Sequence, residues 1–376
     1  MKSFHCAPYL KPLVLSVICV MLVVATALTG CQLSSIAGKN NTPAPNPEEI
    51  EGETNLNEDV KNDGEENGPE APVILYNVLT GRETTSELAG LRPVAVCIDN
   101  TPYSLPQYGL SDAQMVIEAP LADGGTRLML LTTDYRYVTT IGAVASTRSY
   151  LLELGAAFGA IQSFDGTDGT VSEEDLKLFT SLDNKDPNVA GLYYTDPTRF
   201  LENNLMTNGI LLDAAIRGAE ITATGDVKVP YVFAESGKTV SLDGGFATSV
   251  SVAYSEDLRV SFTYDNESGT YLRGQYGAPQ LDGANGEQAC FDNLFLLYTS
   301  SVTYDREDGR DLDLVLSDGG TGYYCTGGQR RQISWTMAED GTLSFVDADG
   351  EALEVNRGTS YIGMVSAGAK DSVTIR

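Results

Sequence analysis

The sequence predicts an α+β fold, with an N-terminal mixed α/β domain over residues 73–225 and a β-rich C-terminal domain over residues 226–376. Short apolar runs alternate with segments of helical spacing between 73 and 225, as expected when helices cover a mixed sheet. After about residue 226 the helical spacing fades, and apolar and polar residues alternate with period two, which is typical of strands.

The N-terminal segment has the order of features found in a bacterial lipoprotein signal. Lys2 and Lys11 precede an apolar run at 13–28, which is shorter than the roughly 20 residues that span a membrane. Small residues then lead to Cys31. We therefore predict a signal peptide at 1–30 and lipidation of Cys31 by acyl chains such as palmitate, which anchors the protein to the outer face of the cell membrane. The alternative is a noncleaved anchor with a chance cysteine.

Residues 31–72 are predicted to be an acidic, disordered tether, because they contain ten acidic residues, only Lys39 and Lys61, and few large apolar side chains. The whole chain carries a formal charge of −28, and −22 of it falls on residues 73–376 once the +2 signal and the −8 tether are set aside. Such a surface argues against nucleic acid as a partner, since phosphate binding needs a concentrated basic surface.

Several elements of the N-terminal domain can be placed from local patterns. Buried-strand runs at 94–98, 115–121 and 128–132 predict strands, and the turn residues at 122–125 join the last two in a hairpin. Helical spacing at 150–158 and a capped start at 172–175 predict two helices. Two further helices are predicted to begin near 196–197 and at Thr207, the second ending at Gly218.

The β-rich C-terminal domain is predicted from period-two alternation at 260–264 and 312–316, with turns at 327–328 and 347–350. Three cysteines remain after the signal and Cys31, namely Cys97, Cys290 and Cys325. Cys97 lies in an apolar run and is expected to be a buried small hydrophobe. A bridge between Cys290 and Cys325 stays open.

The residue inventory limits the chemistry. The only histidine is His5, inside the predicted signal, so the mature chain has no Ser-His-Asp or Cys-His catalysis and no His-ligated metal. We expect neither a cofactor nor a metal. The preferred hypothesis is a noncatalytic binding or scaffolding module of the cell envelope, whose partner is an envelope protein or a wall polymer. The alternative is a carboxylate-dependent enzyme that acts on cell-wall glycan, because paired carboxylates hydrolyse glycosides without histidine.

A polar cluster is expected in the N-terminal domain. With the hairpin turn centred on residues 123–124, Glu118 would face Met129, and Glu118 and Arg127 would be diagonal neighbours on one face of the sheet. A structural ion pair is one interpretation, because a charge inside an apolar strand is costly unless it is paired.

The other interpretation is a ligand-binding pocket. Asp99 and Asn100 end the strand at 94–98, where open α/β sheets place ligands, and Arg148 begins a helix against the dipole preference. The hypothesis is that Asp99, Asn100, Glu118, Arg127 and Arg148 converge on one polar pocket.

The chain also resembles the YerB-like lipoproteins, a two-domain family. The resemblance rests on the runs RPVAVCIDN at 92–100, PQYGLSDA at 106–113 and GGTR at 124–127, and on GYYCTGG at 322–328 with later aromatic residues. It covers roughly residues 78–365 and implies a membrane-anchored envelope protein with no assigned activity. This chain departs from the family pattern at two places. The family usually has an Arg at the position of Ala145 and a His-containing segment at the positions of residues 162–165.

Lipidation of Cys31 is testable by Cys31→Ser. Without the thiol no acyl chain can be attached, so the variant protein is expected to leave the membrane fraction or to stay unprocessed. Cell fractionation with immunoblotting measures both outcomes, and normal size with normal membrane retention would contradict the prediction.

Overall fold

The computed structural model describes residues 73–376 apart from 168–170, 183–186, 226 and 307–308. The predicted signal peptide, Cys31 and the tether at 31–72 lie outside these residues. Among the residues described, no helix is both long and apolar enough to cross a membrane.

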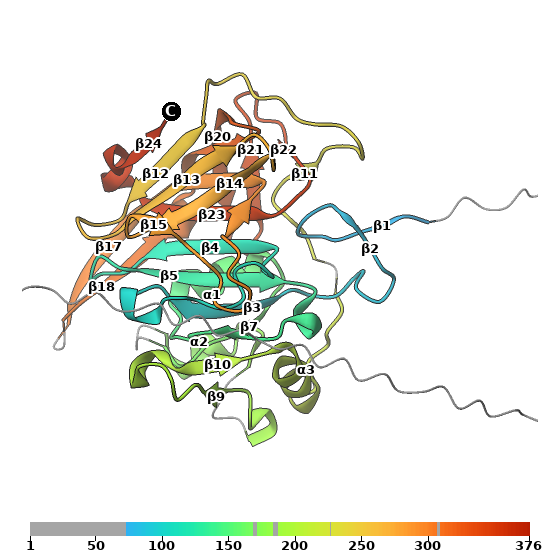
Figure 1. The fold of residues 1–376 in the computed structure, drawn as a ribbon, viewed down its shortest axis with the longest axis vertical. Helices are drawn as coiled ribbons and strands as arrows, with labels where there is room; N and C mark the ends of the chain where they lie inside the picture. The colour runs from blue at the N-terminus through green and yellow to red at the C-terminus, as the bar shows by residue number, and fades with distance from the viewer. Residues whose placement is uncertain (1–72, 168–170, 183–186, 226, 307–308) are drawn as a thin grey trace, which may run out of the picture. The chain divides into compact units, whose positions relative to one another are not determined.

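An eleven-stranded sheet organises the fold (Figure 1). One run of its neighbouring strands comes from the N-terminal part of the chain: β4 (Met115–Pro120), β5 (Thr126–Thr132), β3 (Val94–Asp99), β7 (Ile161–Ser163) and β8 (Ser181–Leu182). The others come from the C-terminal part: β21 (Leu343–Val346), β20 (Gln329–Met337), β19 (Gly320–Thr326), β17 (Asn293–Arg306), β23 (Ser360–Ser366) and β18 (Gly309–Val315), which pairs with β17.

The two parts of the chain join where β23 pairs in parallel with both β4 and β17. Figure 1 shows β23 beside β4. The described residues, from 73 to 376 with the gaps given above, accordingly belong to one compact unit. The predicted boundary between residues 225 and 226 stays a prediction, and the hydrogen-bonded sheet continues across the two predicted domains.

A six-stranded sheet packs against one face of the large sheet. It comprises β15 (Ala278–Pro279), β14 (Thr270–Gln275), β13 (Arg259–Asp265), β12 (Ser249–Ala253), β24 (Val373–Ile375) and β16 (Cys290–Phe291). Smaller sheets are formed by β6 (Ile141–Gly142), β10 (Leu205–Thr207) and β9 (Tyr194–Thr195), by β1 (Leu75–Tyr76) and β2 (Glu83–Thr84), and by β11 (Val232–Phe233) and β22 (Glu354–Val355).

Helices are short in the described part of the chain. The α-helices are α1 (Ser149–Ala157), α2 (Glu173–Leu176) and α3 (Gly209–Gly218). Single 3₁₀ segments are η1 (Pro102–Ser104), η2 (Tyr135–Tyr137), η3 (Pro187–Val189), η4 (Leu201–Asn203), η5 (Leu316–Asp318) and η6 (Ala367–Ser372). Ser172 forms the capping box of α2, and the Asn208 side chain accepts a hydrogen bond from Leu211 N to cap α3.

The central strands of the large sheet, such as β3, β4 and β5, contribute to two hydrophobic clusters because successive side chains point to opposite faces. On one face, Val96 and Leu128 pack in a cluster that includes Phe262 of the six-stranded sheet. On the other face, Cys97 and Met129 pack in a cluster with the buried leucines of α1. Both faces of the central strands are therefore covered.

The β-rich character predicted for residues 226–376 agrees with the structure, and the described chain is mostly β overall. The mixed α/β pattern predicted for residues 73–225 is not confirmed. Most strand pairs there are antiparallel, and the parallel exceptions include β3 with β7 and β7 with β8.

Two of the helix predictions for this region need correction. The helix predicted near 196–197 is wrong: Asp196 accepts hydrogen bonds from Thr198 in a local turn, and only the 3₁₀ segment η4 follows. The next helix is capped by Asn208 rather than by Thr207.

The three cysteines in the described residues are free thiols, with Cys97 and Cys325 buried and Cys290 exposed. An alkylating reagent is therefore expected to modify Cys290 first in the native protein. Burial raises the pKa of Cys325 to about 12, which makes its thiolate scarce as well as inaccessible. Peptide mass spectrometry after native labelling measures the order, and a native protein in which neither Cys290 nor Cys325 reacts before reduction would indicate a disulfide instead.

Candidate functional site

The hairpin between β4 and β5 differs by one residue from the register predicted for it. Glu118 lies opposite Leu128 rather than Met129, and Arg127 lies opposite Ala119. Residues directly opposite each other share a face and successive residues alternate, so Glu118 and Arg127 point to opposite faces of the sheet. The register prediction is therefore wrong.

The length of the hairpin loop explains this difference. Five residues, 121–125, separate the last residue of β4 from the first residue of β5, so the turn is centred on Asp123. Gly124 adopts a positive φ of 85°, and Leu121 N donates to Gly125 O across the loop base. An odd loop moves the register by one residue relative to a two- or four-residue loop, which reverses the face of every side chain in one strand.

Asp99 and Arg127 lie opposite each other on β3 and β5 and form a close ion pair. Arg127 Nη1 lies 2.7 Å from Asp99 Oδ1, and both side chains are about nine-tenths buried. The other carboxylate oxygen, Oδ2, accepts hydrogen bonds from Thr101 N at 3.2 Å and from Asn203 Nδ2 at 2.9 Å. Both oxygens of Asp99 are thus engaged by hydrogen-bond donors.

This ion pair borders an open cavity of about 380 Å³ at the carboxyl end of β3. We call it the β3 cavity. The residues that line it are Asp99, Thr101, Tyr103, Arg127, Val144, Ala145, Ser146, Asp165, Glu202 and Asn203. Arg127 Nε is buried and has no hydrogen-bond partner within the described residues. A buried donor left unpaired is costly, so this guanidinium is an unusual feature of the cavity wall.

Aromatic side chains stand beside the β3 cavity. The rings of Tyr103 and Phe200 meet edge to face with centroids 5.9 Å apart, and both side chains are 68% exposed. Exposed aromatic rings beside polar groups are common in binding surfaces, because they offer apolar contact area with little entropy to lose.

Arg148 lies next to the β3 cavity rather than in its lining. It occupies the N-cap position of α1, and its Nη1 donates to Ser146 Oγ at 3.1 Å and to Thr147 O at 2.9 Å. Ser146 Oγ also lies 3.5 Å from Arg127 Nη2. Ser146 therefore links the two guanidinium groups at one edge of the cavity.

Glu118 lies in a buried network on the opposite face of the sheet. Its Oε2 lies 2.6 Å from Arg273 Nη2 and accepts a hydrogen bond from Tyr361 Oη at 2.8 Å. Its Oε1 accepts from Thr126 Oγ1 at 2.7 Å and from Asn100 Nδ2 at 3.2 Å. The side chains of Glu118 and Arg273 are both 0% exposed. This network belongs to the core and is closed to ligands.

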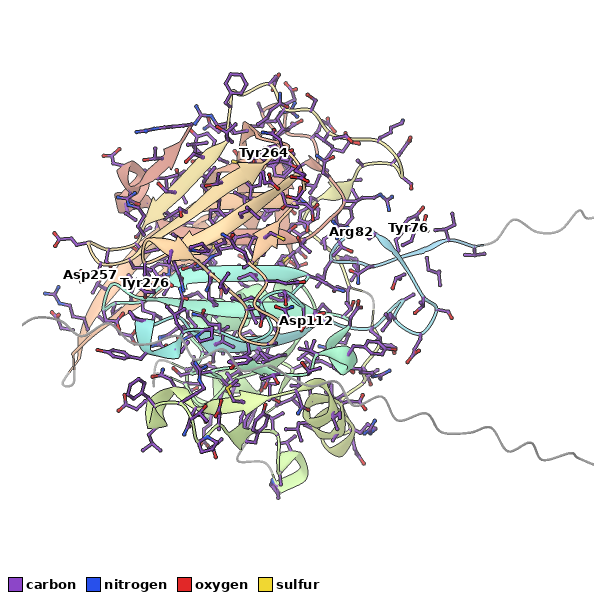
Figure 2. The ribbon with its side chains drawn as sticks, viewed as in Figure 1. Tyr76, Arg82, Asp112, Asp257, Tyr264 and Tyr276 are labelled. Atoms are coloured by element: carbon purple, nitrogen blue, oxygen red, sulfur yellow. The ribbon has the colours of Figure 1, made fainter. Side chains whose placement is uncertain are left out.

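The network continues through side chains that follow β3, η1 and β15 in the chain. Gln107 Nε2 donates to Asn100 Oδ1 at 2.8 Å, and Gln280 Nε2 donates to Gln107 Oε1 at 2.9 Å. Tyr276, which Figure 2 labels, donates its hydroxyl to Asn100 O at 2.8 Å. Burial and the charge of Glu118 raise the pKa of Tyr361 well above its usual value, so its phenol stays protonated and donates.

The five residues predicted to share one pocket are therefore divided between two sites. Asp99 and Arg127 line the β3 cavity and Arg148 adjoins it, whereas Asn100 and Glu118 belong to the buried network. For Glu118 the interpretation as a structural ion pair is the better one, with Arg273 rather than Arg127 as its partner.

Several residues of both sites were not anticipated from the sequence. Tyr103 lies in the 3₁₀ segment η1, Asn203 ends η4 and Phe200 precedes η4, and no local pattern brings them to the end of β3. The sequence did carry a signal for Arg273, because Arg273 alternates with Tyr271 and Gln275 on the buried face of β14. An arginine at a buried position of a strand requires an acidic partner. The described residues contain no group of three or more His, Cys, Asp or Glu arranged to hold a metal ion.

Two family models match the chain. The N-terminal domain of a protein of unknown function, DUF3048, matches residues 79–222, and the C-terminal domain of the same family matches residues 250–362. The chain belongs to this family. The resemblance to YerB-like proteins seen in the sequence is confirmed by these models together with the relative and the solved structure that follow.

The chain is also similar to a protein of Bacillus subtilis. The chain is 26% identical over 302 residues to "Putative lipoprotein YerB" of strain 168, covering 79% of this chain and 88% of the relative. The crystal structure of YerB from Bacillus subtilis superposes with a TM-score of 0.69 at 24% identity and covers 80% of this chain and 99% of that chain. The structural match supports the fold.

The buried network is expected to dominate stability. Glu118→Gln and Arg273→Met each leave one buried charge without its partner, so each should lower the free energy of unfolding by about 3–5 kcal/mol. Denaturant unfolding measures this loss. The double variant should lose less than the sum of the single variants, because it leaves no charge unpaired.

An exposed pair provides the control for this experiment. Glu235 lies 2.5 Å from Lys238 and both side chains are largely exposed, so Glu235→Gln should leave stability unchanged within error. Single variants of Glu118 and Arg273 that behave like this control would contradict a stabilising role for the buried pair.

Proposed function

We propose that the protein is a membrane-anchored extracytoplasmic lipoprotein that acts as a noncatalytic binding or scaffolding module of the cell envelope. The signal-like segment with Cys31 and the name of the Bacillus relative support the lipid anchor and the position at the outer face of the membrane. The acidic segment at 31–72 would then give the folded part roughly 35 Å of reach from the membrane.

We infer that the ligand binds in the β3 cavity, and one observation carries this assignment. The cavity is open, yet it is bordered by a nearly buried arginine whose Nε has no partner and whose other nitrogens are held by Asp99 and Ser146. Such a guanidinium is fixed in position in the cavity wall, and each terminal nitrogen carries a second N–H group that can donate to an acceptor on a ligand.

The chemistry of the lining favours a glycan of the cell wall as the ligand. A sugar ring offers an apolar C–H face to an aromatic ring and hydroxyl groups to amides, carboxylates and guanidinium groups. Tyr103 and Phe200 supply the aromatic faces, and Asn203, Arg127 and Asp165 supply polar groups at the same cavity. A peptide or another envelope protein would use the same aromatic faces with fewer hydroxyl contacts.

Binding is favoured over catalysis by the hydrogen bonds and the ion pair that Asp99 forms. Glycoside hydrolysis needs one carboxyl group that delivers a proton, whereas both oxygens of Asp99 already accept hydrogen bonds and one is ion-paired. The alternative of a carboxylate-dependent glycan enzyme would assign the chemistry to Asp165 and Glu202, which line the same cavity. Glycan turnover that is lost in Asp165→Asn or Glu202→Gln would support that alternative.

The binding site is testable by co-sedimentation of the full chain, in nonionic detergent, with purified wall sacculi. Tyr103→Ala and Phe200→Ala should each weaken binding about tenfold, because they remove aromatic contact area at the cavity. Tyr137→Ala is the matched control, since Tyr137 is 62% exposed and lines a different cavity. Equal effects of Tyr103→Ala and Tyr137→Ala, or no binding by the unmodified protein, would refute the assignment.

Arg148→Ala provides an independent test of the edge of the β3 cavity. The variant loses the Arg148 guanidinium group, which is the second one that contacts Ser146. This loss is expected to weaken capture of the sacculi, while the melting temperature stays nearly unchanged. A collapse of the melting temperature in this variant would show that Arg148 has a structural role instead.

A further inference from the structure

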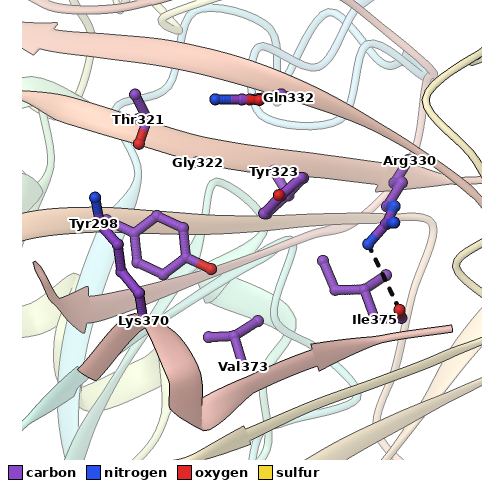
Figure 3. A pocket seen from close by; sticks show the side chains of 9 residues that line it. All are labelled: Tyr298, Thr321, Gly322, Tyr323, Arg330, Gln332, Lys370, Val373 and Ile375. Atoms are coloured by element: carbon purple, nitrogen blue, oxygen red, sulfur yellow. Dashed lines mark hydrogen bonds between the residues drawn. The ribbon is translucent and has the colours of Figure 1, made fainter. Parts of the chain in front are cut away.

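A second cavity, of about 310 Å³, lies at the edge where the two large sheets meet, far in sequence from the β3 cavity. Strands β17, β19 and β20 of the eleven-stranded sheet form one wall, and η6 with β24 forms the other (Figure 3). We call it the β24 cavity. Its lining consists of Tyr298, Thr321, Gly322, Tyr323, Arg330, Gln332, Lys370, Val373 and Ile375.

The charge of this lining is opposite to that of the protein. Acidic residues outnumber basic ones by 52 to 24 in the chain, yet the β24 cavity is lined by two cations, Arg330 and Lys370, and by no carboxylate. The β3 cavity and the cavity around Tyr137 both include carboxylates in their linings. A cation-only lining is therefore specific to this site among these three cavities.

Both cations keep their charge available to a ligand. Neither Arg330 nor Lys370 forms an ion pair with a carboxylate within the described part of the chain. Arg330 is held instead by the carbonyl oxygens of Gly244 and Ile375, at 3.2 and 3.5 Å. Uncharged partners position a guanidinium group without neutralising it.

Aromatic rings position the same two cations. The Arg330 guanidinium lies 5.5 Å from the ring centroid of Tyr323, and Lys370 Nζ lies 5.4 Å from that of Tyr298. Burial raises the pKa of Tyr298 to about 12, so its hydroxyl remains a neutral donor at physiological pH. The rings therefore fix the cations and add no negative charge.

Neutral donors complete the site. Tyr323 on β19 lies opposite Gln332 on β20, so the two side chains share one face of the sheet, and Thr321 is two residues along the same strand. Val373 and Ile375 supply an apolar patch on the facing wall. The cavity thus combines two positive charges, several hydroxyl or amide donors and an apolar surface.

We propose that the β24 cavity binds a phosphate group carried by a small polyol, such as a glycerol phosphate. A tetrahedral anion accepts several hydrogen bonds at once, which matches a guanidinium, an ammonium and neutral donors around one space. The apolar wall contacts the carbon skeleton of the polyol, which bare phosphate lacks. The net charge of the protein opposes this only weakly, because charges beyond about 8 Å are screened at physiological ionic strength.

The proposal is tested by isothermal titration of the full chain, in nonionic detergent, with sn-glycerol 3-phosphate. The expected result is saturable binding that weakens as salt is raised, with no binding of glycerol and weaker binding of inorganic phosphate. Absence of saturable binding, or binding of glycerol as tight as that of glycerol phosphate, would overturn the proposal.

Neighbouring residues on β20 provide a matched pair of variants. Arg330→Gln removes a charge inside the cavity and should weaken binding at least about tenfold, the cost of a lost charge-assisted hydrogen bond. Arg331→Gln removes the same charge one residue away, on the opposite face, where Arg331 lies 3.4 Å from Asp243, and should change binding less than about twofold.

A second variant protects the test against misfolding of Arg330→Gln. Lys370 is exposed and Lys370→Met removes its charge while keeping a long side chain, so this variant should fold and still bind more weakly. Equal affinity of the Lys370→Met, Arg331→Gln and unmodified proteins would overturn the proposal. Tight binding only to phosphatidylglycerol vesicles, with none of the free glycerol phosphate, would refute a site for a small polyol phosphate and indicate a membrane surface instead.

Discussion

The ion pair between Glu118 and Arg273 is the constraint on which the rest of the structure depends. It joins β4 of the large sheet to β14 of the six-stranded sheet, and both side chains are completely buried. Burying two charges costs several kcal/mol per ion before their attraction is counted, so they require each other in good geometry. Tyr361, from β23, donates to the same carboxylate. The strand that joins the two parts of the chain, β23, is therefore held in the same buried network.

This constraint also determines where the β3 cavity forms. Thr126 donates to Glu118 inside the network, and the next residue, Arg127, points to the opposite face of β5 and reaches Asp99. A strand fixed on one face by a buried network holds the following side chain in a fixed direction on the other. The arginine at the cavity is therefore positioned by packing in the core as well as by its own partners, which suits a binding surface that must be preorganised.

The two cavities described above differ in electrostatics and therefore in the ligands that they suit. The β3 cavity mixes Arg127 with several carboxylates and exposed aromatic rings, which suits a neutral ligand rich in hydroxyl groups. The β24 cavity presents Arg330 and Lys370 without a carboxylate, which suits an anion. Two cavities of different chemistry, one on each part of the chain, support the proposal that the protein holds envelope components together.

The sequence by itself determined the elements whose patterns are local. It placed β3, β4, β5 and the first helix to within a few residues, because the apolar pattern of a buried strand or a helix face lies within one short segment of sequence. It also identified Glu118 and Arg127 as charges that need partners, because a charge in an apolar strand is costly unless it is paired. Only the tertiary structure decided which partners they have. The odd loop at 121–125 put Glu118 and Arg127 on opposite faces, and Arg273 comes from a different sheet, 155 residues away. Such pairings depend on loop geometry and on the packing of distant strands, and neither leaves a periodic signal in the residues that it brings together.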